Sequence, residues 1–225
     1  MDKIKVLELF AGSRSIGKAS EKLGCDVFSS DIEPFENINY VVNILEFDVN
    51  NVPFVPNVIW ASPPCTSFSV ASIGKHWNKD NTPKTENAQL GVSIVQKTLD
   101  IINHFLNINP NLIFYIENPR GKLRKLPVVE NLERTTVMYC QYGDSRMKPT
   151  DIWSNNIKTI LNPIGFEPKT CFNGNRNCHH EIAPRGSRSG TQGLKGAYDR
   201  SKLPEQLCSE VISKAIEKIS VTNNQ

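Results

Sequence analysis

A cysteine directly after two prolines is the first group in this sequence with an evident chemistry. Cys65 follows Pro63 and Pro64, and the apolar run from Asn57 to Ala61 stops just before them. Proline cannot donate a hydrogen bond to a sheet, so the chain must leave the predicted strand before it reaches the thiol. The thiol then lies on a rigid loop at the carboxyl end of a strand, where open α/β sheets bind their ligands. A thiolate there is an effective nucleophile near neutral pH, although a single loop cysteine can also be structural.

A carboxyl group follows a second buried strand. The run from Leu112 to Ile116 predicts that strand, and Glu117 comes directly after it. The carboxyl ends of neighbouring parallel strands meet at one edge of a sheet, so Glu117 can lie close to the Cys65 loop as its acid partner. The structural alternative for Glu117 is an ion pair with Arg120 on the same turn.

The first residues predict a strand, a turn and a helix. Ile4 to Phe10 has a strand pattern, a turn of small residues opens a helix from Ser15 to Leu23, and Cys25 to Asp31 predicts a second strand. In a Rossmann-like sheet, an acid at the end of the second strand accepts hydrogen bonds from a ribose, a role open to Asp31. Alternatively, Asp31 only caps a turn.

In this order and spacing, the turn at Gly12, the Pro-Cys loop at Cys65 and Glu117-Asn118 resemble the cytosine C5 DNA methyltransferase family. A fourth stretch, Arg200-Ser201-Lys202-Leu203-Pro204 with the helix after it, is similar to the last motif of that family, so the resemblance covers most of the chain. It implies an α/β fold: a Rossmann-like, S-adenosylmethionine-dependent methyltransferase sheet flanked by helices, with a minimal target-recognition segment.

The resemblance also implies where S-adenosylmethionine binds. Small residues after the first strand let backbone N–H groups approach the methionine carboxylate at a helix N-terminus. The chain departs from the family in keeping only Gly12 of the usual glycines, in having Arg14, which must point away from the cofactor, and in having Asn43 where an Asp is usual. The implied cofactor-binding residues are Phe10, Gly12, Ser15, Asp31, Ile32, Asn43, Ile44 and Pro63.

The same resemblance implies a reaction on a cytosine that is flipped out of double-stranded DNA. Cys65 would add to C6 of the base, and Glu117 would hold or protonate N3. After Tyr142-Gly143, Arg146 and Lys148 resemble the basic residues of the eighth motif, which contact the base and nearby phosphates. The methyl group comes from S-adenosylmethionine, and no metal is needed for the reaction.

Three other functions remain open. An RNA cytosine C5 methyltransferase acting on tRNA can use the same motifs. A catalytically idle DNA-binding module is compatible with the departures at Arg14 and Asn43, and with Thr150, which lies where the second Arg of the eighth motif is usual. An amino-methyltransferase fits least, because that chemistry typically uses Asp or Asn before Pro-Pro, where this chain has Ser62.

The predicted organisation is a catalytic core over residues 1–148, a short target-recognition segment over 149–189, and a C-terminal motif and helix over 190–225 that pack back on the core. A third strand is expected from Asn39 to Ile44. The polar stretch from Ser72 to Thr82 predicts a mobile loop that closes over nucleic acid, with Lys75 and His76 as phosphate contacts.

A group of possible metal ligands lies in the recognition segment. Cys171, Cys178, His179 and His180 are close enough in sequence to suggest a structural zinc, with Cys140 as a further ligand. The spacing does not contain a C-x-x-C pair, so unrelated polar loop residues are the alternative.

Composition is typical of a soluble globular chain of 225 residues, with 39% hydrophobic residues. Residues 118–202 hold 15 Lys and Arg against 7 Asp and Glu, and the remainder 11 against 16. A basic half suits a phosphate-binding surface, or is an ordinary solvated face. Six scattered cysteines, no signal-peptide pattern and no membrane-span pattern predict a cytoplasmic protein with reduced thiols. A monomer is expected, although the sequence does not determine the oligomeric state. Its size suggests a stand-alone modification enzyme of a phage or mobile element, with or without a restriction-modification partner nuclease.

Overall fold

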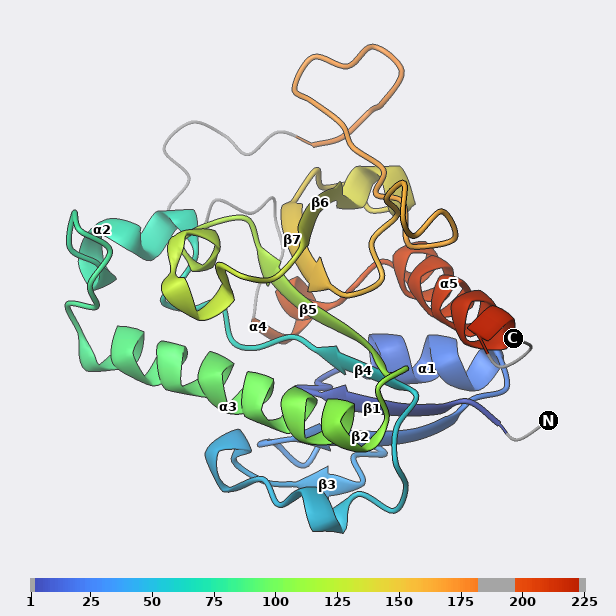
Figure 1. Ribbon diagram of the computed structural model, residues 1–225. Coiled ribbons are helices and arrows are strands. Elements are labelled where there is room, and N and C mark those ends of the chain that lie inside the picture. The colour runs from blue at the N-terminus through green and yellow to red at the C-terminus, as the bar shows by residue number, and fades with distance from the viewer. Residues whose placement is uncertain (1–2, 182–196, 223–225) are drawn as a thin grey trace.

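The structure of the chain, a computed structural model, describes residues 3–181 and 197–222. Its centre is a seven-stranded sheet in the order β3-β2-β1-β4-β5-β7-β6 (Figure 1). Strands β3, β2, β1, β4 and β5 run parallel to one another. Strand β7 runs antiparallel to both β5 and β6. The α/β expectation is therefore confirmed. The strands are β1 (Lys5–Leu9), β2 (Asp26–Asp31), β3 (Tyr40–Val41), β4 (Val58–Ala61), β5 (Ile113–Pro119), β6 (Arg134–Met138) and β7 (Pro149–Ser154).

Helices cover both faces of this sheet. Among the described residues, none of them is long and apolar enough to cross a membrane. The α-helices are α1 (Ser15–Lys22), α2 (Ile73–His76), α3 (Glu86–Ile108), α4 (Ala197–Ser201) and α5 (Glu205–Thr222). Short 3-10 helices occupy Ile44–Glu46, Val49–Asn51, Val70–Ser72, Leu123–Lys125, Pro127–Val129 and Tyr139–Tyr142.

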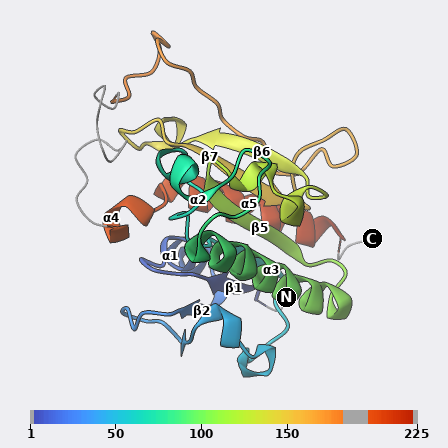
Figure 2. The ribbon, with the colours of Figure 1, turned by 90° about the vertical axis from the view of Figure 1, so that its left-hand side faces the viewer.

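Alternation along the central strands builds two apolar layers. Successive side chains of a strand point to opposite faces, so Leu7 and Ile59 face α3, while Val6 and Trp60 face α1 and α5. Figures 1 and 2 show α3 on one face and the α1–α5 pair on the other. One apolar face of α5 is buried and consists of Leu207, Cys208, Val211, Ile212, Ala215 and Ile219.

Two elements differ from the sequence expectation. The third strand covers only Tyr40–Val41, because the Asn43 side chain accepts a hydrogen bond from the N–H of Leu45 and begins a 3-10 helix instead. Strand β7 was not expected, and it places Pro149–Ser154 inside the central sheet. The sheet thus extends beyond residue 148, into the segment expected to recognise the target. Residues 182–189 of that segment lie outside the described residues.

Candidate active site

The loop that carries Cys65 is fixed to the end of β5. Strands β4 and β5 are paired with Ala61 opposite Ile116, so the loops after them leave the sheet side by side. The Asn118 side chain donates from Nδ2 to the carbonyl of Pro63 at 2.8 Å, and the N–H of Lys122 donates to the carbonyl of Phe68 at 2.7 Å. These two bonds hold the cysteine loop at both of its ends.

Gly121 permits the closest approach between these loops. A Cβ at this position would lie 2.2 Å from the carbonyl oxygen of Phe68, well inside van der Waals contact. Glycine is the residue that lets two backbones come this close. The half-buried thiol of Cys65 therefore stands on a loop with little freedom to move relative to Glu117.

Glu117 is a buried acid at the carboxyl end of β5, with 5% of its surface exposed. The Tyr139 hydroxyl donates to its Oε1 at 3.1 Å, and the Ser62 hydroxyl also bonds to it. Burial raises the pKa of Glu117, against the opposing effects of Lys148 and these two hydroxyls. The carboxyl group thus retains its proton at a higher pH than an ordinary glutamate.

Lys148 lies beside both groups. Its ammonium is 4.6 Å from the centre of the Tyr139 ring and interacts electrostatically with Glu117 and with Cys65. Burial lowers the pKa of Lys148, and the two acidic neighbours partly restore it. Cys65, Glu117 and Lys148, expected from the sequence as catalytic residues, are thereby brought together.

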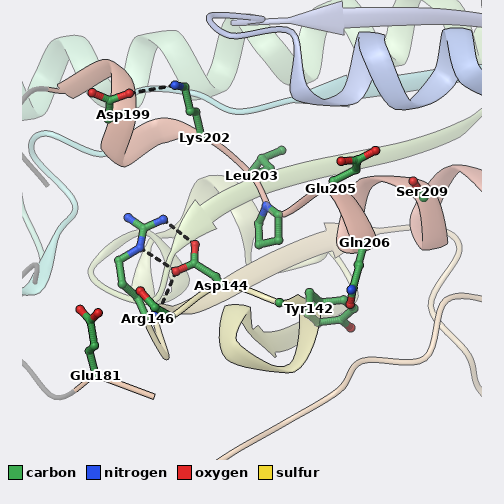
Figure 3. A pocket seen from close by; sticks show the side chains of 13 residues that line it. Tyr142, Asp144, Arg146, Glu181, Asp199, Lys202, Leu203, Glu205, Gln206 and Ser209 are labelled. Carbon is green, nitrogen blue, oxygen red and sulfur yellow. Dashed lines mark hydrogen bonds and ion pairs between the residues drawn. The ribbon is translucent and has the colours of Figure 1, made fainter. Parts of the chain in front are cut away.

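Arg146 lies in a separate, adjacent hollow. It is buried and forms a two-pronged ion pair with Asp144, at 2.8 and 2.6 Å, while its Nη1 has no hydrogen-bond partner within residues 3–181 and 197–222. Figure 3 shows this pair on one wall of a cavity of about 950 Å³. The start of α5 and the Lys202–Asp199 pair form the opposite wall. Arg146 is thus held by Asp144, whereas Lys148 interacts electrostatically with both Cys65 and Glu117.

The turn after β1 meets the end of β2 through Asp31. Its carboxylate accepts the N–H of Gly12 at 2.8 Å and that of Glu33 at 2.9 Å. Phe10 and Gly12 both adopt positive φ, of 58° and 49°, which turns the chain sharply toward the N-terminus of α1. Asp31 therefore caps this turn and keeps lone pairs that a ribose can use.

The remaining residues expected to bind the cofactor divide into two groups. Ile32 is 61% exposed beside Asp31, and the Ser15 hydroxyl accepts the N–H of Leu203 at 3.3 Å. Ile44, in contrast, is buried in the apolar layer under α3, and the Asn43 side chain caps the 3-10 helix that begins there. Because Ile44 is buried and the Asn43 side chain caps a helix, both have little freedom to contact an adenine.

Helix α4, near the C-terminus, lies close to the β2–β3 loop and to the start of α1. The Tyr198 ring of α4 lies 5.3 Å from that of Phe35 in the β2–β3 loop. A cavity of about 250 Å³ opens between α4 and α1 and is lined in part by Ser13, Lys18 and Lys202. Residues 190–196, and the side chain of Arg200 in the fourth motif, lie outside the described residues.

Arg14 points away from the turn, as the cofactor expectation requires. Its Nε donates to the Ser29 hydroxyl at 3.1 Å, its Nη2 pairs with Glu21, and its charge lies near the buried Glu8. Glu8 accepts the N–H of Ile16 at 3.1 Å and the Ser29 hydroxyl at 2.8 Å. The sequence pattern does not predict this network, and its one signal there is a glutamate inside an otherwise apolar strand.

Three residues that support Glu117 and the Cys65 loop could not be recognised from the sequence. Tyr139, Ser62 and Asn118 hold Glu117 and the cysteine loop, yet in the sequence they look like ordinary strand-end residues. His76, expected to contact phosphate, is instead buried, and its Nδ1 lies 2.6 Å from the Thr85 hydroxyl.

Many of the Lys and Arg side chains that make the second half basic are paired with other groups of the protein. Arg124 forms an ion pair with the buried Asp151, and Lys122 is buried and donates to the Asn81 side chain at 2.6 Å. Lys158, Lys169 and Lys202 are paired with acidic side chains. The charge balance alone therefore overstates how much positive charge is free for phosphate.

The fold is similar to that of a solved methyltransferase. The chain superposes on the structure of the Entamoeba histolytica methyltransferase EhMeth with a TM-score of 0.52 and 15% identity, over 76% of this chain and 57% of that one. A DNMT2 mutant of Spodoptera frugiperda gives a TM-score of 0.42 and 19% identity over 74% of this chain and 53% of that one. The chain therefore spans little more than half of either protein.

A viral protein is similar to this chain over nearly its whole length. The chain is 28% identical to a Frog virus 3 protein named "Probable DNA (cytosine-5)-methyltransferase", over 93% of this chain and 99% of that protein. No protein-family model matches the chain. This nearly full-length similarity agrees with the resemblance to the cytosine C5 DNA methyltransferase family that the motifs around Cys65 and Glu117 indicate.

Proposed function

We propose that this protein transfers a methyl group from S-adenosylmethionine to C5 of cytosine in double-stranded DNA. The observation that carries the proposal is the arrangement of Cys65 and Glu117 on adjacent strand ends, with the ammonium of Lys148 interacting with both. A nucleophile, a buried acid and a cation in one place suit addition to an electron-poor ring. The homology to a viral protein with a cytosine-5 methyltransferase name agrees with this chemistry.

The residues near the turn fit the proposed methyl donor. Asp31 caps the turn at Gly12 and can accept further hydrogen bonds from ribose hydroxyls. The N-terminus of α1, with Ser15 and Lys18 at its cavity, suits a carboxylate. Exposed Ile32 offers an apolar surface for an adenine. When bound, S-adenosylmethionine supplies an electrophilic methyl group.

Each residue of the site has one task in the proposed reaction. The Cys65 sulfur forms a bond to C6, and the positive charge of Lys148 favours the thiolate that does so. Protonated Glu117 donates to N3 and stabilises the negative charge that this addition places on the ring. Once C5 carries the methyl group, a base takes the C5 proton, the electron pair of that C–H bond restores the double bond, and Cys65 leaves C6 as a thiolate.

The test is methyl transfer from labelled S-adenosylmethionine to cytosine-containing DNA and, in parallel, to tRNA. We expect label in DNA as 5-methylcytosine with the wild type and with Thr66→Ala, an exposed neighbour on the same loop. Cys65→Ala is expected to transfer none. Label in tRNA alone would assign an RNA substrate, and DNA binding without label in either would indicate an idle module.

A mechanism-based trap sharpens this test. On DNA that carries 5-fluorocytosine, C5 has no proton to lose, so the bond between Cys65 and C6 should persist after methyl transfer. Peptide mapping is expected to find the adduct on Cys65 and to find none on Cys65→Ala. An adduct on another cysteine would overturn the role assigned to Cys65.

A further inference from the structure

Four side chains with sulfur or imidazole ligand atoms converge on one point outside the active site. They are Cys140, in the 3-10 helix Tyr139–Tyr142, and Cys171, Cys178 and His180 from the segment after β7. One ligand atom of each lies within 4.8 Å of those of all the others. Cys140 is 31 positions before Cys171, so the fold, and not a short sequence motif, assembles this group.

Two distances within this group match the edges of a tetrahedral metal site. The Nδ1 of His180 lies 3.5 Å from the Cys178 sulfur and 3.8 Å from the Cys171 sulfur. Ligand bonds of about 2.3 Å to sulfur and about 2.0 Å to nitrogen give tetrahedral edges of about 3.5 to 3.8 Å. All three cysteines are free thiols and form no disulfide.

Neighbouring amides support the thiolate form that a metal requires. The Nδ2 of Asn175 points at the Cys171 sulfur at 3.3 Å, and the Nε2 of Gln141 at the Cys178 sulfur at the same distance. Donors of this kind stabilise charge on ligating sulfurs. Three thiolates and one imidazole form a set that favours Zn²⁺ over hard cations such as Mg²⁺ or Ca²⁺.

We propose that Cys140, Cys171, Cys178 and His180 bind one structural Zn²⁺. Four protein ligands leave no open position, so this site has a structural role and takes no part in methyl transfer. The exposed His179, a candidate ligand in the sequence, lies outside the group. The proposal does not depend on the function proposed above.

The metal would fix the expected target-recognition segment to the core. This segment is short and polar, and it buries few apolar side chains between Cys171 and Glu181. A metal can replace the missing apolar core of such a small unit. Just after His180, the N–H of Glu181 donates to the carbonyl of Ser145 at 2.7 Å, next to Arg146 and its cavity (Figure 3). Zinc binding would therefore position this segment beside the catalytic face.

The first measurement is metal content of the purified full-length chain by mass spectrometry. We expect about one zinc per chain in the wild type and in His179→Ala, which removes the neighbouring imidazole only. Cys178→Ser and His180→Ala are expected to lose most of it. A folded wild type without zinc, or zinc retained in both ligand variants, would overturn the proposal.

A second measurement works even if the ligand variants do not fold. Cobalt bound in place of zinc should give thiolate-to-metal charge-transfer absorption, and zinc should protect Cys171 and Cys178 from alkylation until a chelator removes it. Peptide mapping before and after chelation reads out each cysteine separately. Equal alkylation of both cysteines with and without chelator would contradict a metal site here.

Discussion

Two buried glutamates lie toward the carboxyl ends of parallel strands of this sheet, and they differ in what surrounds them. Glu8 on β1 has its carboxylate occupied by the backbone N–H of Ile16 and the hydroxyl of Ser29, with Arg14 nearby. Glu117 on β5 is held by two hydroxyls and stands beside Lys148, which also interacts with Cys65. Burial raises the pKa of both groups.

This comparison shows that a perturbed acid does not by itself indicate an active site. Glu8 joins the start of α1 to β2, because its bonds reach only groups of the chain's own framework. Glu117 instead lies beside the ammonium of Lys148, which also interacts with the Cys65 thiol. The groups around each acid, more than its pKa, thus distinguish the structural Glu8 from Glu117, the candidate catalytic acid.

The largest expected difference between the two acids is in rate. We expect Glu117→Gln to reduce methyl transfer to DNA by about 10²- to 10⁴-fold, because an amide cannot supply a proton to N3. Glu8→Gln should cost less than about tenfold, or about 1.4 kcal/mol in the barrier. The measurement is kcat at saturating S-adenosylmethionine. Similar losses in the two variants would contradict the distinction drawn here.

A second prediction concerns pH and stability. The pKa of Glu8 is raised from 4.5 to about 7, chiefly by burial, so the native state binds this proton more tightly than the unfolded chain does. The free energy of unfolding should therefore fall as pH rises from about 4.5 to about 7, by about 3 kcal/mol in total, and then level off.

Glu8→Gln removes this titration and serves as the control. Urea unfolding at both ends of that pH range should show the loss in the wild type and a flatter response in Glu8→Gln. The same pH slope in both proteins would mean that Glu8 does not titrate as its burial implies.

The smallest expected effect concerns the support of Glu117. Tyr139→Phe removes one hydroxyl donor, a bond worth about 1 kcal/mol, and should lower kcat about fivefold with little change in melting temperature. Tyr142→Phe is the matched control, because its hydroxyl accepts the N–H of Lys169 and does not contact Glu117. Equal kinetics for wild type and Tyr139→Phe would show that Glu117 does not need this bond.

Much of the architecture follows from apolar patterns in the sequence. The parallel strands β1, β4 and β5 are short apolar runs that end in turns, and the last helix has one apolar face, so periodicity predicts them. Cys65 and Glu117 could be paired because parallel strands present their carboxyl ends at one edge. These parts depend on local chemistry that the sequence displays directly.

The parts that escaped prediction depend on partners far away in sequence. Strand β7 begins with proline and buries Asp151, which looks like a loop residue until Arg124 neutralises it. Glu8 is tolerated inside β1 because Ser29 and the start of α1 satisfy its oxygens. His76 is polar in sequence but buried, because Thr85 supplies its hydrogen bond. Contacts of this kind have no periodicity to detect.

The reversed direction of β7 determines where the chain can accept new length. Because β7 runs against β5, it ends with Ser154 opposite Tyr115, near the amino ends of the parallel strands and away from Glu117. The following turn exposes Ile160 and Leu161 almost completely, at 99% and 95%. Insertions at this tip would extend into solvent on the side opposite to the chemistry. Larger relatives could thus gain whole modules there without disturbing the geometry around Cys65.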